Sequence, residues 1–222
     1  MTKPKPVNKQ KTVIALAVVL LAGFALATTV YRAKKDEKLE RVIEETPSVL
    51  VRPGAKTLGP SDAKVHIVEF MDPGCETCRA FHPFLEQLIA DNPGQVRLSI
   101  RYLPLHEGAD TMVKILEAAD TQGKYWETLH LMFASQPVWA SHHHPQPDKI
   151  WPLLDRAGLD TEAIRRDMDA PEISVILERD LADARSLGIR KTPAFFVNGE
   201  PLRSFGYDQL RKLVDDAVAA SY

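Results

Sequence analysis

Hydrophobic and polar positions divide the chain into an apolar N-terminal stretch, a highly charged stretch and a longer mixed region. Residues 12–31 contain no charged side chain and follow four lysines, whereas residues 32–45 are charged at ten of fourteen positions. An uncharged run behind lysines is typical of a membrane anchor or an export signal. The charged run that follows it is typical of a solvated stalk.

Two fates of the N-terminal segment fit its sequence. Residues 25–27 read Ala-Leu-Ala, a pattern that signal peptidases cleave, whereas the apolar run continued to Val30 is just long enough to span a bilayer. We favour an uncleaved anchor through residues 12–31, with cleavage near Ala27 as the alternative.

Beyond the charged stretch, strand and helix patterns alternate. Residues 65–70 are rich in β-branched side chains, residues 96–102 alternate with period two, and a helical pattern beginning near Cys75 separates them. From about residue 108 to residue 187 the apolar spacing is helical. Residues 194–197, the Asn-Gly turn at 198–199 and residues 201–204 then predict a β-hairpin before a closing helix.

Within the helical region, local signals place individual helices. Asp148 is predicted to cap one helix that ends before Gly158, and Pro171 is predicted to open another that ends at Gly188. The apolar stripe of this second helix is interrupted at Asp180.

The expected architecture is therefore α/β, with a βαβ half, a helical insert over about 108–187, and a ββα half. We assign residues 1–31 to the signal or anchor, residues 32–56 to the charged stalk or linker, and residues 57–222 to one folded domain. A hydrophobic content of 45% is enough to form its core.

The charge balance argues against nucleic-acid binding. Lys and Arg number 28 against 30 Asp and Glu; the first 45 residues hold nine basic and five acidic side chains, which leaves 19 minus 25, or −6, for the rest. A domain of this charge has no basic field to attract a polyanion. Any affinity for anionic lipid belongs to the N-terminal segment.

The two cysteines of the chain, Cys75 and Cys78, form a C-x-x-C pair where the first predicted strand leads into a helix. The helix N-terminus stabilises a thiolate on Cys75, so Cys75 is the predicted nucleophile, and Cys78, one turn along, is placed to resolve a mixed disulfide. A structural disulfide closing so short a loop would contribute only about 2 kcal/mol. We therefore expect a redox-active disulfide and no other cofactor.

Metal binding is the alternative interpretation of the cysteine pair. One C-x-x-C supplies two of the four ligands that a structural zinc needs, and the others would come from His106 or from residues 142–144, a run of three histidines. His82, four residues after Cys78, could tune the pair or simply pack beside its aromatic neighbours, and stays unassigned.

These residues resemble the DsbA-like group of thioredoxin-fold disulfide oxidoreductases from bacterial envelopes, over most of residues 57–220. The shared motifs surround the first strand, the cysteine pair, the second strand, the insert and the last strand. They are Gly59-Pro60, Ala63, residues 68–70, Cys75 and Cys78, Pro83, residues 103–106, residues 122–126 and residues 188–193.

The resemblance implies roles that the residue pattern alone does not. Pro193 is expected to be cis beside the cysteine pair, with the backbone of Thr192 open to an extended substrate peptide. Glu69 is expected to be the buried acid that moves the proton of Cys78. Strand alternation alone is as compatible with Glu69 facing solvent. Without the resemblance, a trans turn that opens a strand would be the commoner interpretation of Thr192-Pro193.

The dipeptide between the cysteines departs from the strongest oxidases of the group, which commonly have Pro-His there. Glu76 and Thr77 occupy these places, and Glu76 adds negative charge near the thiolate. We therefore expect a less depressed Cys75 pKa and a less oxidising disulfide than in Pro-His members.

The sequence thus predicts an envelope thiol:disulfide oxidoreductase, tethered to the inner membrane with its domain in the periplasm. It is expected to act as an oxidase of exported protein thiols and to exchange electrons with a membrane redox partner. The alternatives are a membrane-tethered reductase or isomerase, and a copper- or zinc-binding envelope protein that uses Cys75, Cys78 and residues 142–144.

Overall fold

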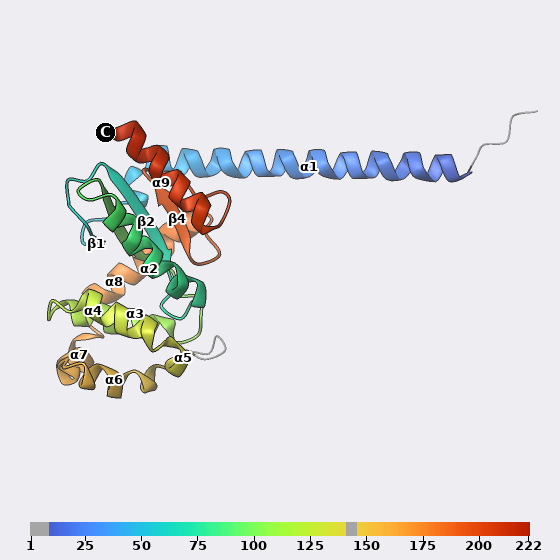
Figure 1. Cartoon of the computed structure of the whole chain (residues 1–222). Helices are drawn as coiled ribbons and strands as arrows, with labels where there is room; N and C mark the ends of the chain where they lie inside the picture. The colour runs from blue at the N-terminus through green and yellow to red at the C-terminus, as the bar shows by residue number, and fades with distance from the viewer. Residues whose placement is uncertain (1–8, 141–145) are drawn as a thin grey trace, which may run out of the picture. The chain divides into compact units, whose positions relative to one another are not determined.

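A computed structural model describes residues 9–140 and 146–222 and divides the chain into two units, Met1–Glu45 and Thr46–Tyr222 (Figure 1). The run of three histidines at residues 142–144, considered above as metal ligands, lies outside the described residues. The second unit begins at Thr46, so residues 46–56, which we assigned to the stalk or linker, are part of the compact unit. Val49 and Leu50 explain this, because both are buried.

The described part of the first unit is one long helix, α1 (Lys9–Glu45). From Leu16 onward it is long and apolar enough to cross a membrane, a test that a signal sequence also passes. The hydroxyl groups of Thr28 and Thr29 both donate to the Ala25 carbonyl at 2.8 Å, so these polar side chains are satisfied within the helix. Arg41 pairs with Glu37 one turn away at 2.9 Å in the charged part.

In the described part of the second unit, five strands form one mixed sheet in the order β1-β3-β2-β4-β5. The central β2 runs parallel to β3 and antiparallel to β4. The strands are β1 (Lys56–Leu58), β2 (Val65–Met71), β3 (Val96–Tyr102), β4 (Ala194–Val197) and β5 (Glu200–Pro201). This is the predicted thioredoxin arrangement, and it places β2 in the middle of the sheet.

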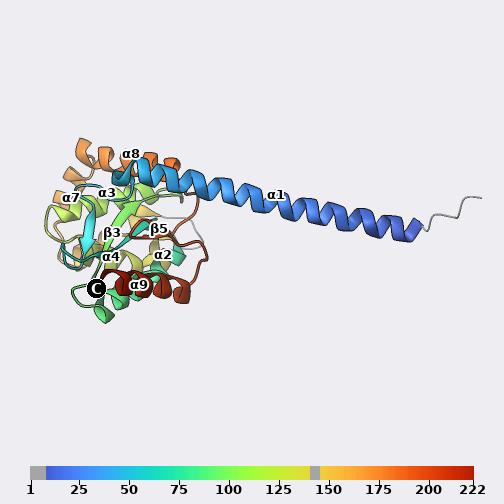
Figure 2. The same ribbon diagram turned by 90° about the horizontal axis from the view of Figure 1, so that it is seen from above.

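Helices cover both faces of the sheet. α2 (Glu76–Asp91) and α9 (Tyr207–Ser221) pack together on one face, and α8 (Pro171–Ser186) lies on the other (Figure 2). The helical insert gathers beyond one end of the sheet in Figure 1. Its helices before α8 are α3 (Ala109–Asp120), α4 (Tyr125–Ala134), α5 (Gln136–Trp139), α6 (Trp151–Arg156) and α7 (Thr161–Asp167).

The strand and helix predictions are confirmed in type, with three differences in detail. The second hairpin strand is only β5, shorter than the predicted 201–204. Asp148 caps no α-helix, because it lies in a 3₁₀ turn and α6 begins at Trp151. Pro152 explains that start, since proline fits only the first turn of a helix. The short elements β1, α5 and α7 were not predicted.

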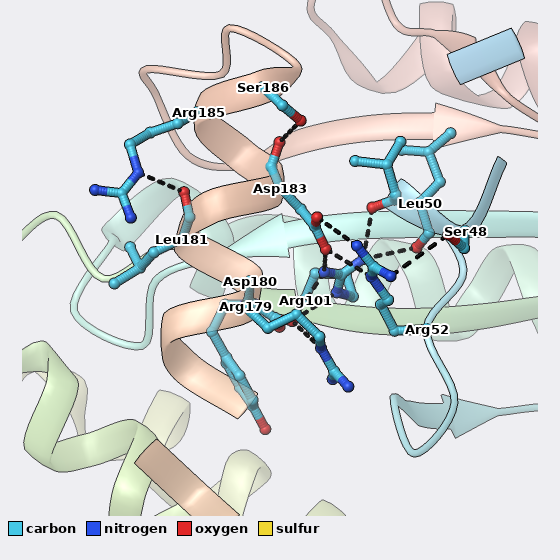
Figure 3. Close-up of polar contacts among 12 residues, drawn as sticks. Ser48, Leu50, Arg52, Arg101, Arg179, Asp180, Leu181, Asp183, Arg185 and Ser186 are labelled. Carbon is cyan, nitrogen blue, oxygen red and sulfur yellow. Dashed lines mark hydrogen bonds and ion pairs between the residues drawn. The ribbon is translucent and has the colours of Figure 1, made fainter. Parts of the chain in front are cut away.

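A buried guanidinium joins α8 to the sheet. Arg101 of β3 is fully buried and donates to Asp180 at 3.0 Å, to Asp183 at 2.6 Å and to the carbonyls of Val49 and Leu50 at 2.8 and 3.0 Å (Figure 3). Asp180 is therefore the interruption in the α8 apolar stripe because it faces this cation. The second carboxylate, Asp183, also accepts two hydrogen bonds from Arg52.

Replacing this cation should be costly. In an Arg101→Met variant, Asp180 and Asp183 stay buried without their main partner, so we expect the free energy of unfolding to fall by about 3–5 kcal/mol. The measurement is urea unfolding of the full chain in detergent. Arg166→Ala, which removes an exposed pair with Asp167, is the matched control and should cost at most about 1 kcal/mol. Equal losses in the two variants would contradict the role given to Arg101.

Candidate active site

The turn between β2 and α2 places Cys75 at the start of a helix. Cys75 is the N-cap of α2, with extended backbone angles (φ −80°, ψ 119°), and its Sγ accepts a hydrogen bond from the Cys78 N–H at 3.4 Å. Both cysteines are free thiols in the structure. Between them, Glu76 and Thr77 are exposed, whereas Cys75 is 6% exposed and Cys78 is fully buried.

This position makes the two thiols chemically unequal. Hydrogen bonding with the Cys78 side chain is the largest cause that lowers the pKa of Cys75, to about 5; burial opposes it, and Thr192 and the helix N–H groups assist it. Burial, followed by the interactions with Cys75 and Glu69, raises the pKa of Cys78 well above its ordinary value. At neutral pH the pair therefore holds one thiolate, on Cys75, and one thiol, on Cys78.

Asp72 holds the turn that carries Cys75. The side chain is fully buried, and one of its oxygens accepts a hydrogen bond from the Gly74 N–H at 2.7 Å. The other accepts the N–H groups of Leu105 and His106 at 2.7 and 3.0 Å and lies 2.6 Å from His106 Nδ1. The sequence offered His106 only as a possible zinc ligand, so this contact between two loops was missed.

Gln136 of α5 supports the same turn from the helical insert. Its Nε2 donates to the Pro73 carbonyl at 2.8 Å and to the Cys75 carbonyl at 3.1 Å, and the side chain is 1% exposed. A glutamine at the start of an unpredicted four-residue helix gives no signal that sequence reasoning could use.

The Thr192–Pro193 peptide bond is cis, the geometry that the resemblance implied. Cys75 Sγ lies 3.4 Å from the Thr192 carbonyl oxygen, to which it donates in its protonated form. β4 begins directly afterwards and pairs Ala194 with Phe70 of β2. The loop that ends at Pro193 therefore lies against the nucleophile predicted from the cysteine spacing.

Glu69 lies inside the protein and does not face solvent. It is 2% exposed in β2, between Ile100 of β3 and Phe195 of β4, and its Oε1 has no hydrogen-bond partner among the described residues. Burial first, and the Cys75 charge second, raise the pKa of Glu69 to about 8. The alternation of polar and apolar residues could not predict whether Glu69 is buried or exposed, because every residue of β2 is buried.

The ionisation of Cys75 can be measured directly. A pH titration of the reduced chain, followed by the ultraviolet absorbance of the thiolate, should give a Cys75 pKa near 5. That value lies between about 3.5 for DsbA and about 7 for thioredoxin. Replacing Glu76 by Gln should lower it further, because a negative charge near the thiolate is removed, whereas Glu162→Gln in the exposed part of α7 should leave it unchanged. A titration near the ordinary value, about 9, would contradict this account.

Comparison with known proteins agrees with this geometry. The family model described as thioredoxin matches residues 51–216. A Na⁺/H⁺ antiporter NhaA of Herminiimonas arsenicoxydans is 33% identical over 150 residues, which are 68% of this chain and 23% of that protein. Disulfide bond formation protein D of Bacillus subtilis is 22% identical over 190 residues, which are 82% of this chain and 83% of that protein.

Solved structures place the chain in the same group. The crystal structure of a thioredoxin-like oxidoreductase from Silicibacter pomeroyi is 31% identical, with a TM-score of 0.67, over 78% of this chain and 98% of that one. The chain spans only 21–24% of the length of the NhaA antiporters that it matches first. The family match covers the whole βαβ half, the insert and most of the ββα half. The chain therefore belongs to the thioredoxin family, as the resemblance to its DsbA-like members implied.

Proposed function

We propose that this protein is a thiol:disulfide oxidoreductase that donates disulfides to exported proteins through the Cys75/Cys78 pair. The observation that carries the proposal is the inequality of the two thiols, with Cys75 stabilised as a thiolate at the start of α2 and Cys78 buried as a thiol. The cis Thr192–Pro193 bond beside Cys75 and the similarity to disulfide bond formation protein D support it.

In the proposed oxidising direction, the chemistry of the leaving groups gives the following steps. A substrate thiolate attacks Cys75 Sγ of the Cys75–Cys78 disulfide, the S–S bond breaks, and Cys78 leaves with the electron pair and takes up a proton. A second substrate thiolate then attacks the substrate sulfur of the mixed disulfide and releases Cys75 as a thiolate. The substrate gains a disulfide, and the pair gains two electrons. A low Cys75 pKa favours this second release, because stable thiolates leave readily.

Glu69 is the proposed proton carrier for Cys78. A Glu69 pKa near 8 means that this carboxyl is mostly protonated at neutral pH. It can therefore give a proton to the Cys78 thiolate that forms in a buried environment and take it back in the reverse reaction.

Substrate binding is assigned to the edge around Thr192 and Pro193. The Thr192 backbone beside Cys75 would pair with an extended peptide, as the resemblance implies. Exposed apolar side chains include Leu105 and Phe205 in loops and Tyr207 at the start of α9, and both Phe205 and Tyr207 pack on Phe81 of α2. Such a surface suits an unfolded polypeptide better than a small thiol.

The proposed location is the periplasmic side of the inner membrane, with residues 12–31 as the anchor and a membrane redox partner that reoxidises the pair. The apolar helix α1 supports the anchor, and a signal cleaved near Ala27 is the alternative. Delivery of electrons by that partner in the opposite direction would make the protein a reductase or isomerase.

The reduction potential of the Cys75–Cys78 couple distinguishes these directions. The nucleophilic cysteine of thioredoxin has a pKa of about 7, whereas that of Cys75 is about 5. This difference stabilises the reduced form of the present pair by about 2.7 kcal/mol relative to thioredoxin, which corresponds to about 60 mV. We therefore expect a reduction potential near about −210 mV, well above the roughly −270 mV of thioredoxin. Equilibration of the full chain with glutathione buffers measures it.

A matched variant tests the cause of that potential. Glu76→Pro together with Thr77→His should move the potential toward about −120 mV, the value of DsbA, by stabilising the thiolate further. A potential at or below about −270 mV for the unaltered chain would favour the reductase instead.

Glu69→Gln tests the proton carrier without changing side-chain size. We expect reduction of the disulfide by a model dithiol to slow by about 10²-fold at neutral pH, the range for loss of a general acid. The pH–rate profile should also lose its inflection near 8. Glu127→Gln on the exposed face of α4 is the control. A slower rate with the same inflection would point to a packing defect and not to lost proton transfer.

A further inference from the structure

A second cluster of reactive side chains lies on the active-site helix, away from the cysteines. His82 and Glu86 are one turn apart on α2, and His130 of α4 lies against them. One ligand atom from each of the three residues lies within 4.8 Å of the other two. His130 Nε2 is 2.7 Å from Glu86 Oε1, His82 Nε2 is 4.0 Å from the same oxygen, and the two imidazole ring centroids are 5.0 Å apart.

The side chain of His82 is the part of this cluster whose polar atoms lack partners among the described residues. It is 4% exposed, and neither ring nitrogen has a hydrogen-bond partner among the described residues. A buried imidazole without partners loses the hydrogen bonds it would make in water, at a cost of about 1–3 kcal/mol. Packing against Phe133, 5.1 Å away between ring centroids, does not satisfy those nitrogens. A group that binds a ring nitrogen would remove this cost.

The three side chains leave a route for an ion to enter. The side chain of His130 is 47% exposed and that of Glu86 is 39% exposed, so the cluster is closed at His82 and open toward the surface. A zinc ion holds each ligand at about 2.0–2.2 Å. The three ligand atoms already lie within 4.8 Å of one another, so only a small movement of Glu86 and His130 would bring them into contact with one ion.

We propose that His82, Glu86 and His130 form a zinc site. Two imidazole nitrogens and one carboxylate oxygen are a donor set that suits Zn²⁺, and calcium or magnesium would need more oxygen ligands. Three protein ligands leave the fourth position to water or to a further ligand. The ion would also link α2 to α4 of the helical insert. This site shares no residue with the cysteine pair and does not depend on the proposed oxidase activity.

The test is isothermal titration of Zn²⁺ into the full chain in detergent, without a polyhistidine tag. Cys75 and Cys78 are replaced by Ser in every sample, so that thiolates cannot bind the metal. We expect one Zn²⁺ per chain. His130→Ala at an exposed position and Glu86→Gln at a half-buried one should leave folding intact, and each should weaken binding by roughly 10-fold or more.

A second variant set separates this cluster from the other histidines. Replacing residues 142–144 by Ala should leave the affinity unchanged if the cluster holds the ion. Absence of saturable binding would overturn the proposal. Binding that survives His130→Ala and Glu86→Gln, or that disappears with residues 142–144, would overturn it as well. Co²⁺ provides an independent readout, since a tetrahedral site gives strong visible absorption that His130→Ala should remove.

Discussion

The buried guanidinium of Arg101 is the interaction on which the arrangement of the active site depends. Arg101 projects from β3 to the face opposite the cysteines, where its nitrogens bind two carboxylates of α8 and two carbonyls of the segment before β1. It therefore fixes where α8 lies on the sheet. The chain from the end of α8 to β4 is residues 187–193, so the position of this helix determines where Thr192 meets Cys75. A salt bridge on one face thus positions the Thr192–Pro193 loop beside Cys75.

Burial then converts two identical thiols and one carboxyl into a set with distinct roles. Cys75, the N-cap, receives hydrogen bonds, whereas Cys78 and Glu69 lie deeper and lose solvation. Negative charge on any one of the three raises the cost of charge on the others, so the titrations belong to the group as a whole. At neutral pH the favourable state holds a single charge on Cys75. In the proposed oxidised state that thiolate charge is absent, so the protonation of the site would change as electrons move.

The sequence was informative where local chemistry decides the structure. The C-x-x-C spacing at a strand end and the Asn198-Gly199 turn, where Asn198 has a φ of 48°, predicted local geometry that the structure has. Contacts distant in sequence were not predictable. Asp180 interrupts an apolar stripe because it binds Arg101, which lies 79 residues earlier in the chain. Gln136 donates to the Cys75 carbonyl, although the two residues are 61 positions apart. Glu69 shows the same limit, because alternation carries no information in a strand that is buried on both sides.

The helical insert is part of the active-site structure and not an addition to it. It contacts α2 at two levels: Gln136 binds the carbonyls of Pro73 and Cys75 at the N-terminal end, and His130 binds Glu86 in the third turn. At the first of these contacts, Gln136 Oε1 is buried and has no hydrogen-bond partner among the described residues. A shift of the insert relative to the sheet would therefore alter the hydrogen bonds that hold the Cys75 turn.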